Sequence, residues 1–266
     1  MRRNNVFWAI VLLGAGSILL LNNLGLIKGN VWIYLWSAFL VFLGLWMIFS
    51  PVIFRHNMET RSLALPLEGA PAAKVVFKHA VGTLQVHSLS TPGQLLSGTF
   101  GGGVEEDVER KSNDHTKVTL KIPGDVWMAG PWGGKSEGLA WDVALTGEIP
   151  LTLKFETGVS RSTLDLHDLK VVDLKIETGA SETELYMPAA AGFTDAKISC
   201  GAANVVIHIP LGVAARIHSD AGLATVNIDP RFVKTEAGWE SPDYTTAANK
   251  VDLKLETGVG KIEVIS

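Results

Sequence analysis

A six-residue motif that recurs along the second half of the chain is the strongest constraint on its fold. The copies are LKFETG at Leu153–Gly158, LKIETG at Leu174–Gly179 and LKLETG at Leu253–Gly258, with weaker ones around Gly82, Gly201 and Gly222. The glycines from residue 158 to residue 222 follow one another at intervals of 21, 22 and 21 residues. Such self-similarity is typical of short supersecondary units stacked on one another. Because a repeated scaffold usually offers a surface to partners, binding or regulation is the first functional hypothesis.

Apolar and polar residues alternate on both sides of each glycine. Leu153 and Phe155 fall on one face, while Lys154 and Glu156 fall on the other. Each unit is predicted to be a strand, a glycine turn and a second strand, stacked on its neighbours to bury its apolar face. Glycine would supply a positive φ or a close approach at each corner. The predicted corners are Gly82, Gly158, Gly179, Gly201, Gly222 and Gly258.

The region upstream of the motif also carries the pattern of short strands. The runs are Lys74–Phe77, Thr83–His87, Leu95–Phe100, Val104–Arg110 and Lys117–Ile122, bounded by clusters of Gly, Pro, Ser and Asn. No long segment with a 3.6-residue period appears after residue 62. Residues 63–266 are therefore predicted to form one all-β stacked-repeat domain of the β-solenoid type.

The N-terminal region has the opposite character, because two apolar runs fill it. Val31–Phe49 has 19 residues, about 28 Å as a helix, which is close to the ~30 Å hydrocarbon core of a bilayer. Val6–Leu21 reaches that length by including residues 22–27. Residues 1–55 are predicted to form a transmembrane helical hairpin, with spans at about 6–27 and 31–54, followed by a connector at 56–62.

Two alternatives to this hairpin follow from its flanks. Arg2 and Arg3 before an apolar run also fit a cleaved signal peptide, but a full second span follows the first. Lys and Arg flank the outer ends of the spans, while only Lys28 lies between them, so both termini are predicted to be cytoplasmic. If only one segment crosses, the β domain faces outward.

Charge and cysteine content narrow the choice of partners. Residues 1–62 carry five Lys or Arg and one Glu, which leaves eighteen basic and twenty-six acidic residues for the rest. An acidic domain without a basic stripe argues against a nucleic-acid partner. The only cysteine, Cys200, rules out an internal disulfide. It shares the inward phase of Thr157, Thr178 and Thr257, which favours a buried small side chain over a reactive thiol.

The sequence offers no recognisable constellation for chemistry. The seven histidines are scattered singly, and no HExxH, paired-Cys, GxSxG or Walker pattern is present. We therefore predict no enzymatic activity, no metal and no cofactor. Glu156, Glu177 and Glu256 share one outward phase and could form a calcium ladder. Lysines two residues earlier on the same face favour solvated Glu–Lys pairs instead.

Two segments interrupt the β rhythm and carry aromatic residues. The segment 125–142 contains Trp127, Trp132 and Trp141, and the segment 229–244 contains Trp239. Exposed tryptophans would suit docking to a partner or to a membrane. Alternatively, they cap the open ends of the stack, which is the favoured interpretation for Trp141. The candidate contact residues are Trp127, Trp132 and Trp239.

The sequence resembles a known bacterial arrangement in two regions. The run LLGAGSILLLNNLGLI, with a Leu-Leu-x-Asn-x-Leu-Gly element at Leu19–Gly25, and the run WIYLWSAFLVFLGLWMI resemble the transmembrane region of LiaI- and LiaF-like proteins. The segments WDVALTGEIPLTLKFETGVSRSTLDLHDLKVVDLKIETG and IPLGVAARIHSDAGLATVNID resemble toast-rack, or adhesin-like, β-repeat domains related to cell-wall-active-antibiotic response proteins. The resemblance implies a membrane accessory that restrains a sensor histidine kinase in envelope-stress signalling, although longer versions carry four spans where this chain has two.

Pattern and resemblance together predict a non-enzymatic regulatory protein anchored in the bacterial inner (cytoplasmic) membrane. Its expected partners are membrane lipid and an envelope or signalling protein, such as a sensor kinase. The alternative is an adhesin-like scaffold that self-assembles through exposed strand edges. Access to the β domain from outside the cell would distinguish the two.

Overall fold

The computed structural model describes residues 13, 14, 16, 17, 24, 32, 36, 37, 39–41, 60–110, 115–124 and 139–266. The chain divides into two units, and all of the strands belong to the second. Most of the predicted hairpin lies outside the described residues, and those described within it are helical, apart from a turn at Leu24. No helix in the described part of the chain is long and apolar enough to cross a membrane.

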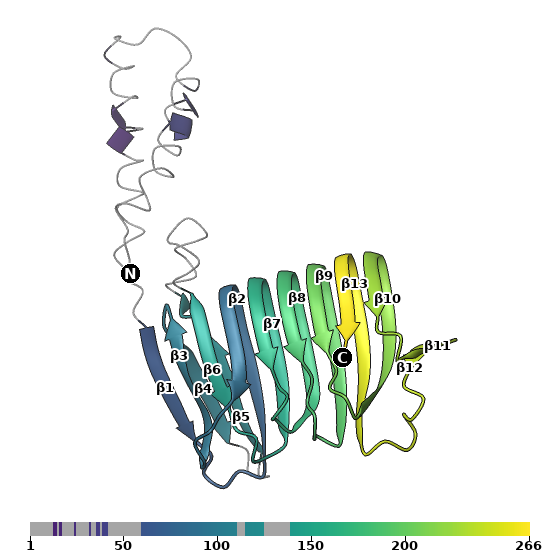
Figure 1. Cartoon of the computed structure of the whole chain (residues 1–266). Coiled ribbons are helices and arrows are strands. Elements are labelled where there is room, and N and C mark those ends of the chain that lie inside the picture. Colours follow the sequence, from purple (N-terminus) through teal and green to yellow (C-terminus); the bar gives the residue numbers. More distant parts are fainter. Residues whose placement is uncertain are drawn as a thin grey trace. The chain divides into compact units, whose positions relative to one another are not determined.

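The β domain contains every strand of the described residues (Figure 1). The strands are β1 (Thr60–Pro66), β2 (Ala72–Ser88), β3 (Gln94–Gly101), β4 (Glu105–Arg110), β5 (His115–Lys121), β6 (Ala140–Leu145), β7 (Leu151–Asp165), β8 (Val171–Tyr186), β9 (Phe193–His208), β10 (Val213–Ile228), β11 (Val233–Thr235), β12 (Gly238–Glu240) and β13 (Asn249–Ile265). The predicted all-β domain is confirmed. Its first strand starts at Thr60, so residues 60–62 belong to the domain and not to the connector.

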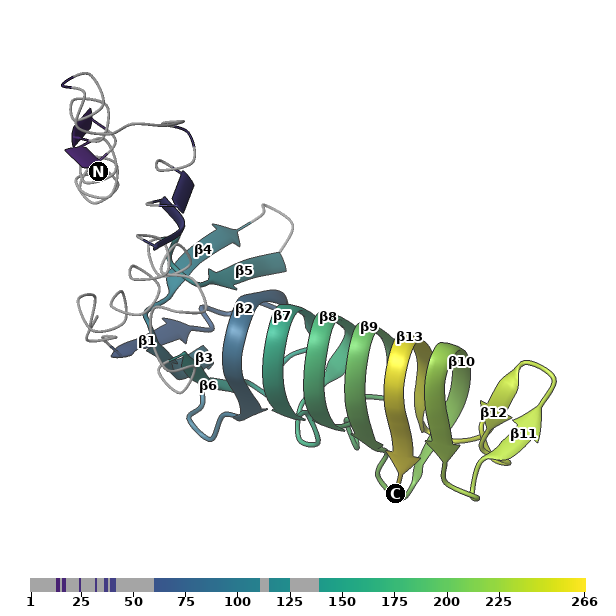
Figure 2. The same cartoon turned by 90° about the horizontal axis from the view of Figure 1, so that it is seen from above.

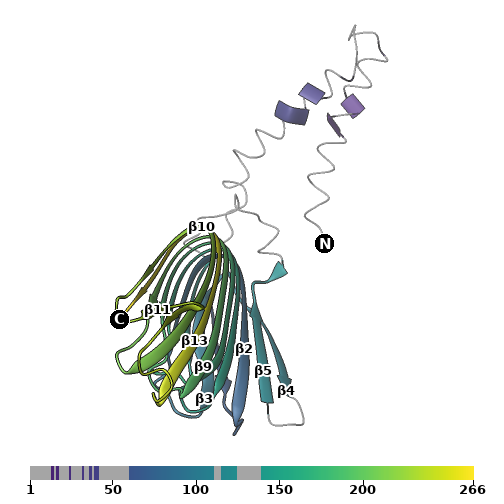
Figure 3. The same cartoon turned by 90° about the vertical axis from the view of Figure 1, so that its right-hand side faces the viewer.

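Six long strands form the body of the domain, which we call the rack. They are β2, β7, β8, β9, β13 and β10, in that spatial order, and each pairs in parallel with its neighbours. Each strand rises through a first arm, bends over and descends through a second arm (Figure 2), so the rack is arched when viewed along the stack (Figure 3). The prediction of a turn at each glycine is wrong in this respect, because the strand continues through the bend without interruption.

The core lies between the two arms. Along the first arm, Phe77 pairs in register with Phe155, which pairs with Ile176, and the two phenylalanine rings stack with centroids 4.8 Å apart. Along the second arm, Leu164 and Leu185 continue the apolar interior. Because each apolar residue packs on its equivalent in the next rung, the repeat in sequence becomes a row of contacts in space.

The two arms end differently at the start of the rack. The first arm of β2 pairs with β5, and the second arm pairs with β6, which leads through β3 to β1. At the other end, the β11–β12 hairpin pairs with the first arm of β10 at Arg216 and Ile217. Within the described residues, the second arm of β10 pairs only with β13.

The order of the last rungs departs from the order of the sequence. The regular spacing favours stacking of consecutive units, but the C-terminal strand β13 lies between β9 and β10. Val259 of β13 is the register partner of both Ala202 in β9 and Leu223 in β10. The insertion is possible because the long 229–248 connection lets the chain return past β10.

Candidate functional site: the glycine corner edge

The bends of the six long strands line up along one edge of the rack, which we call the corner edge. It consists of the corner residue and the residue after it in each rung: Ala80–Val81, Gly158–Val159, Gly179–Ala180, Gly201–Ala202, Gly258–Val259 and Gly222–Leu223. Residues from distant parts of the sequence are therefore neighbours here. The corner edge is the most regular surface that the repeat creates.

Close approach, and not a positive φ, explains the corner glycines. A Cβ added at Gly158 would lie 2.5 Å from the carbonyl oxygen of Ala80, and one at Gly179 would lie 2.9 Å from that of Gly158. The same relation holds between Gly201 and Gly179, at 2.7 Å. Separations below about 3 Å require the backbone to shift, so each rung excludes a side chain at the corner of the next one.

Gly82 has a different place from the one predicted for it. Gly82 pairs with Ser160, two residues beyond the bend, and Ala80 occupies the corner level in β2. Alanine fits there because β5 and β6 flank the two arms of β2 but pair with neither His79 nor Ala80. Gly82 has φ 128°, and its missing side chain leaves room for the carbonyl oxygen of Leu139.

Small polar side chains fill the inside of the corner. Cys200 is the register partner of Thr178 and Thr257 and is 7% exposed, so the predicted buried thiol is confirmed. Burial raises the pKa of this thiol to about 11. A thiol that stays protonated is a poor nucleophile, which agrees with a packing role for Cys200.

His79 takes the same inward position in β2. Its ring is fully buried, lies 4.9 Å from the ring of Trp141, and places Nε2 3.1 Å from the carbonyl oxygen of Leu139. Burial lowers the pKa of His79 to about 4, against an ordinary value of 6.5. The imidazole is therefore neutral at neutral pH, and Nε2–H donates to Leu139.

The outer face of the first arm carries the predicted Glu–Lys pairs. Lys154 bridges Glu156 at 2.6 Å and Glu177 at 3.0 Å, while Lys197 bridges Glu256 of the neighbouring rung at 2.5 Å. A hydrogen bond from Lys154 lowers the pKa of the Glu156 carboxyl. Hydrogen bonds from Lys197, and to a smaller extent from Ser199, lower the pKa of the Glu256 carboxyl. The described residues contain no group of three or more acidic, His or Cys side chains suited to a metal ion.

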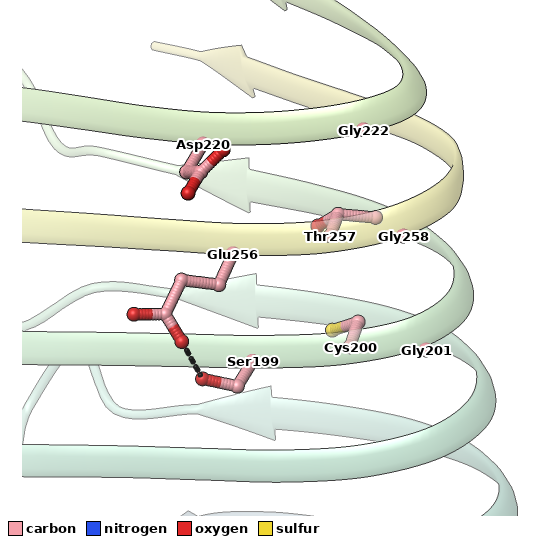
Figure 4. Close-up of a pocket in the computed structure, with 8 residues that line it drawn as sticks. All are labelled: Ser199, Cys200, Gly201, Asp220, Gly222, Glu256, Thr257 and Gly258. Atoms are coloured by element: carbon pink, nitrogen blue, oxygen red, sulfur yellow. Dashed lines mark hydrogen bonds between the residues drawn. The ribbon is translucent and has the colours of Figure 1, made fainter.

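Two shallow depressions lie beside the corner edge, where the glycines leave the backbone bare. Figure 4 shows the one between β9, β13 and β10, which is open to solvent and has a volume of about 450 Å³. Glu256 accepts a hydrogen bond from Ser199 Oγ at 2.8 Å in this depression, and Asp220 lies on the neighbouring rung. The second depression lies between β2, β7 and β8, so the hollowed surface follows the edge.

The predicted aromatic contacts have mixed outcomes. Trp127 and Trp132 lie outside the described residues, so their role stays a prediction. Trp239 of β12 is half-buried against the end of the core, and Phe232, the residue before β11, is 3% exposed. Trp141 is 1% exposed and packs edge-on against Phe100, so it belongs to the core of the second arm.

The match of the chain to family models agrees with this geometry. Residues 54–208, more than half of the chain, match the family described as the N-terminal domain of toast_rack, DUF2154. The chain belongs to the toast-rack family. Residues 6–48 match the LiaI-LiaF-like transmembrane region, which indicates that this toast-rack protein is anchored in a membrane. Both resemblances seen in the sequence are thus confirmed.

A solved structure supports the same fold. A proposed cell adhesion protein from Clostridium sporogenes is 19% identical and has a TM-score of 0.71, over 78% of this chain and 98% of that one. A proposed adhesin from Bacteroides fragilis is 8% identical over the same shares, with a TM-score of 0.29. No curated protein matches the chain.

Proposed function

We propose that this toast-rack protein is a non-enzymatic, membrane-anchored accessory of the bacterial cell envelope whose rack binds a protein partner in envelope-stress signalling. The observation that carries the proposal is the joining, in one chain, of a LiaI-LiaF-like transmembrane region to a toast-rack domain. The rack suits a binding role because its strands are paired over long registers and its ion-paired face is regular.

The proposed topology has two spans with both termini in the cytoplasm, as the flanking Lys and Arg predict. In this arrangement the rack reaches the cytoplasmic parts of membrane partners, such as a sensor kinase. The transmembrane region would bring the partner into the same membrane, so that a weak contact with the rack is strengthened by proximity.

A deletion strain challenged with cell-wall antibiotics tests this function. We expect an altered transcriptional response, restored by the wild-type gene, and a partner that co-purifies with the full chain in mild detergent. A variant that reverses a charge among the Glu–Lys pairs of the first arm, Lys154→Glu, is expected to reduce recovery of the partner. Arg161→Glu on the second arm is the matched control. An unaltered response together with no recovered partner would sink the proposal.

The alternative is an adhesin-like scaffold that self-assembles, and one feature of the structure favours it. The second arm of β10 from Leu223 to Ile228 carries no charge and has a free strand edge in the described part of the chain. Such an edge can add a strand from another copy. The fold likeness to a proposed cell adhesion protein points the same way.

Labelling from outside the cell separates the two functions. Leu211 lies in an exposed loop, so Leu211→Cys provides a reactive thiol, whereas the native Cys200 is buried. A membrane-impermeant maleimide is expected to label Leu211→Cys only after the cells are opened. Labelling of intact cells would favour the adhesin and contradict a cytoplasmic rack.

A further inference from the structure

One row of apolar side chains runs along the corner edge of the rack. The row has one residue from each rung, directly after the corner: Val81, Val159, Ala180, Ala202, Val259 and Leu223. Three of them are well exposed, with Leu223 at 85%, Val159 at 61% and Val259 at 53%. Exposed apolar residues are ordinary when scattered, but here the fold assembles them into a line.

The corner edge is also free of charge. From the residue before each corner to the second residue after it, no rung carries Asp, Glu, Lys or Arg, and His79 is buried and neutral. The nearest charges on the first arm lie two residues before each corner. Lys78 pairs with Glu156 at that level, and Lys154 pairs with Glu156 and Glu177 from the side away from the edge. An uncharged apolar strip with paired charges behind it suits the boundary between lipid headgroups and acyl chains.

The point at which the chain enters the rack lies near the same edge. The first strand, β1, begins at Thr60, which pairs with Gly101 of β3, and the neighbouring residue of β3, Phe100, pairs with Trp141. Trp141 in turn pairs with Leu84, four residues after the corner. The chain therefore enters the rack on the second-arm side, a few residues from the corner edge.

The tether between the matched transmembrane region and the rack is short. The match ends at residue 48, which leaves 11 residues, 49–59, before Thr60. Such a segment spans at most about 40 Å when fully extended. The opposite edge, which carries Leu211, lies one arm of about eight residues, or roughly 26 Å, farther along the strands. The tether therefore joins the rack nearer to the corner edge than to the opposite edge.

We propose that the corner edge rests on the membrane that anchors the chain, with Leu223, Val259 and Val159 in contact with lipid. This inference rests on the membrane anchoring in the proposed function, and it adds the face of the rack that meets the bilayer. The contact is apolar and needs no anionic lipid, because the basic residues that border the edge, Lys78, Arg161 and Lys261, are each paired with a glutamate. Membrane contact would leave both arms and their charged faces free for a protein partner.

Quenching of a fluorescent label by spin-labelled lipid tests the proposal on the full chain. The chain is reconstituted in phosphatidylcholine vesicles that contain doxyl-labelled phosphatidylcholine, in a Cys200→Thr background. An NBD label is attached at Leu223→Cys on the corner edge or at Leu211→Cys on the opposite edge. Leu211 is a matched control because it is also an exposed leucine, at 82% against 85%. We expect at least twofold stronger quenching at position 223.

Equal quenching at both positions, or none at position 223, overturns the proposal. A label at 223 that is shielded from water but not quenched by lipid also overturns it, because protein would then cover the row. A second variant checks the chemistry: with the label at Val259→Cys, Leu223→Glu is expected to reduce quenching at least twofold, whereas Leu211→Glu leaves it unchanged. Both changes are at exposed sites, and circular dichroism checks that the fold is retained.

Flotation of the vesicles distinguishes a failure of this inference from a failure of the proposed anchoring. If the labelled chain floats with the vesicles but position 223 is not quenched, anchoring holds and the membrane contact of the corner edge is wrong. If the chain does not float, both the anchoring and the contact are wrong.

Discussion

The corner edge and the opposite, loop-bearing edge of the rack use glycine for different reasons. At the loops, Gly192 and Gly212 have φ of 76° and 88°, and an added Cβ would meet no atom within 4 Å. At the corners, Gly158 and Gly179 lack a positive φ but have a backbone oxygen where a Cβ would lie. Loop glycines satisfy the local backbone, whereas corner glycines satisfy the neighbouring rung. Only the second kind recurs at a fixed spacing.

Acid sensitivity should distinguish the two edges most strongly, because His79 is buried at the corner. Its pKa in the folded state is about 4, against 6.5 ordinarily, so the unfolded chain binds a proton first as pH falls. The contribution of neutral His79 to the unfolding free energy is therefore fully present above pH 6.5. It decreases toward pH 4, by about 3 kcal/mol in total. Urea denaturation of the full chain in detergent, between pH 7.5 and 4.5, measures this loss.

The variant His79→Thr places the residue of the other rungs at this position and should remove the decrease between pH 6.5 and 5. His167→Gln in a loop of the opposite edge is the control, because His167 is exposed there beside Asp168. The ion pairs of Glu156, Glu177 and Glu256 lose their contribution to the stability of the fold at lower pH, since the pKa values of these carboxyls lie below their ordinary range. An unchanged pH profile in His79→Thr would contradict this account.

The next largest loss of stability is expected when a Cβ is added at a corner glycine. Gly158→Ala would bring a methyl group 2.5 Å from the oxygen of Ala80, and we expect a loss of about 2 kcal/mol of unfolding free energy. Gly222→Ala should lower the unfolding free energy by less, because its Cβ would lie 3.0 Å from the carbonyl oxygen of Gly258. Ala80→Gly is the control at the same level, with a cost of about 1 kcal/mol or less from backbone entropy alone. Equal effects at Gly158 and Ala80 would mean that close approach is not the cause.

Substitution of a loop glycine should destabilise the fold through backbone strain, and not through a steric clash with a neighbouring rung. Gly192→Ala places a side chain in the left-handed region with open space around it, which costs roughly 1 kcal/mol. Gly192→Asn should recover part of that loss, because Asn tolerates this conformation, whereas Gly158→Asn should not improve on Gly158→Ala. Thermal denaturation of the four variants makes the comparison; recovery at both sites would remove the distinction between the edges.

The smallest effect is expected inside the corner at Cys200. Cys200→Thr places the residue of the neighbouring rungs at this position, and we expect a change within about 1 kcal/mol. In the wild-type chain, the thiol should react with a disulfide reagent only under conditions that unfold the rack, because it is buried and its pKa is raised. Rapid reaction of the folded chain would contradict this packing.

Much of the fold could be predicted from local pattern. The alternation around Leu153 and Phe155 reported the buried face correctly, because a strand exposes alternate residues whatever lies beside it. The pairing of Lys154 with Glu156 and Glu177 followed from the same phase. Likewise, the burial of Cys200 could be predicted because it shares the inward phase of the threonines in the other repeats.

The rest depends on which strands are neighbours, and local pattern does not determine that. The spacing of 21 or 22 residues says that Gly201 and Gly222 belong to equivalent rungs, but not that β13 lies between them. Gly82 looked like a corner because it follows a strand-like run. The corner of β2 is Ala80, since no strand of the described residues pairs with Ala80 on the side away from β7, and this condition is visible only in the assembled sheet.

The central claim is that the corner edge is one continuous surface in the order β2, β7, β8, β9, β13, β10. Disulfide trapping in a Cys200→Thr background tests it directly, because Ala202 and Val259 are register partners on adjacent strands about 4.8 Å apart, whereas Leu223 is one strand farther away. Disulfides need Cα atoms within about 7 Å. We predict that the pair Ala202→Cys with Val259→Cys forms a disulfide on mild oxidation and that Ala202→Cys with Leu223→Cys does not. The reverse result would show that the rungs stack in sequence order and would contradict the account.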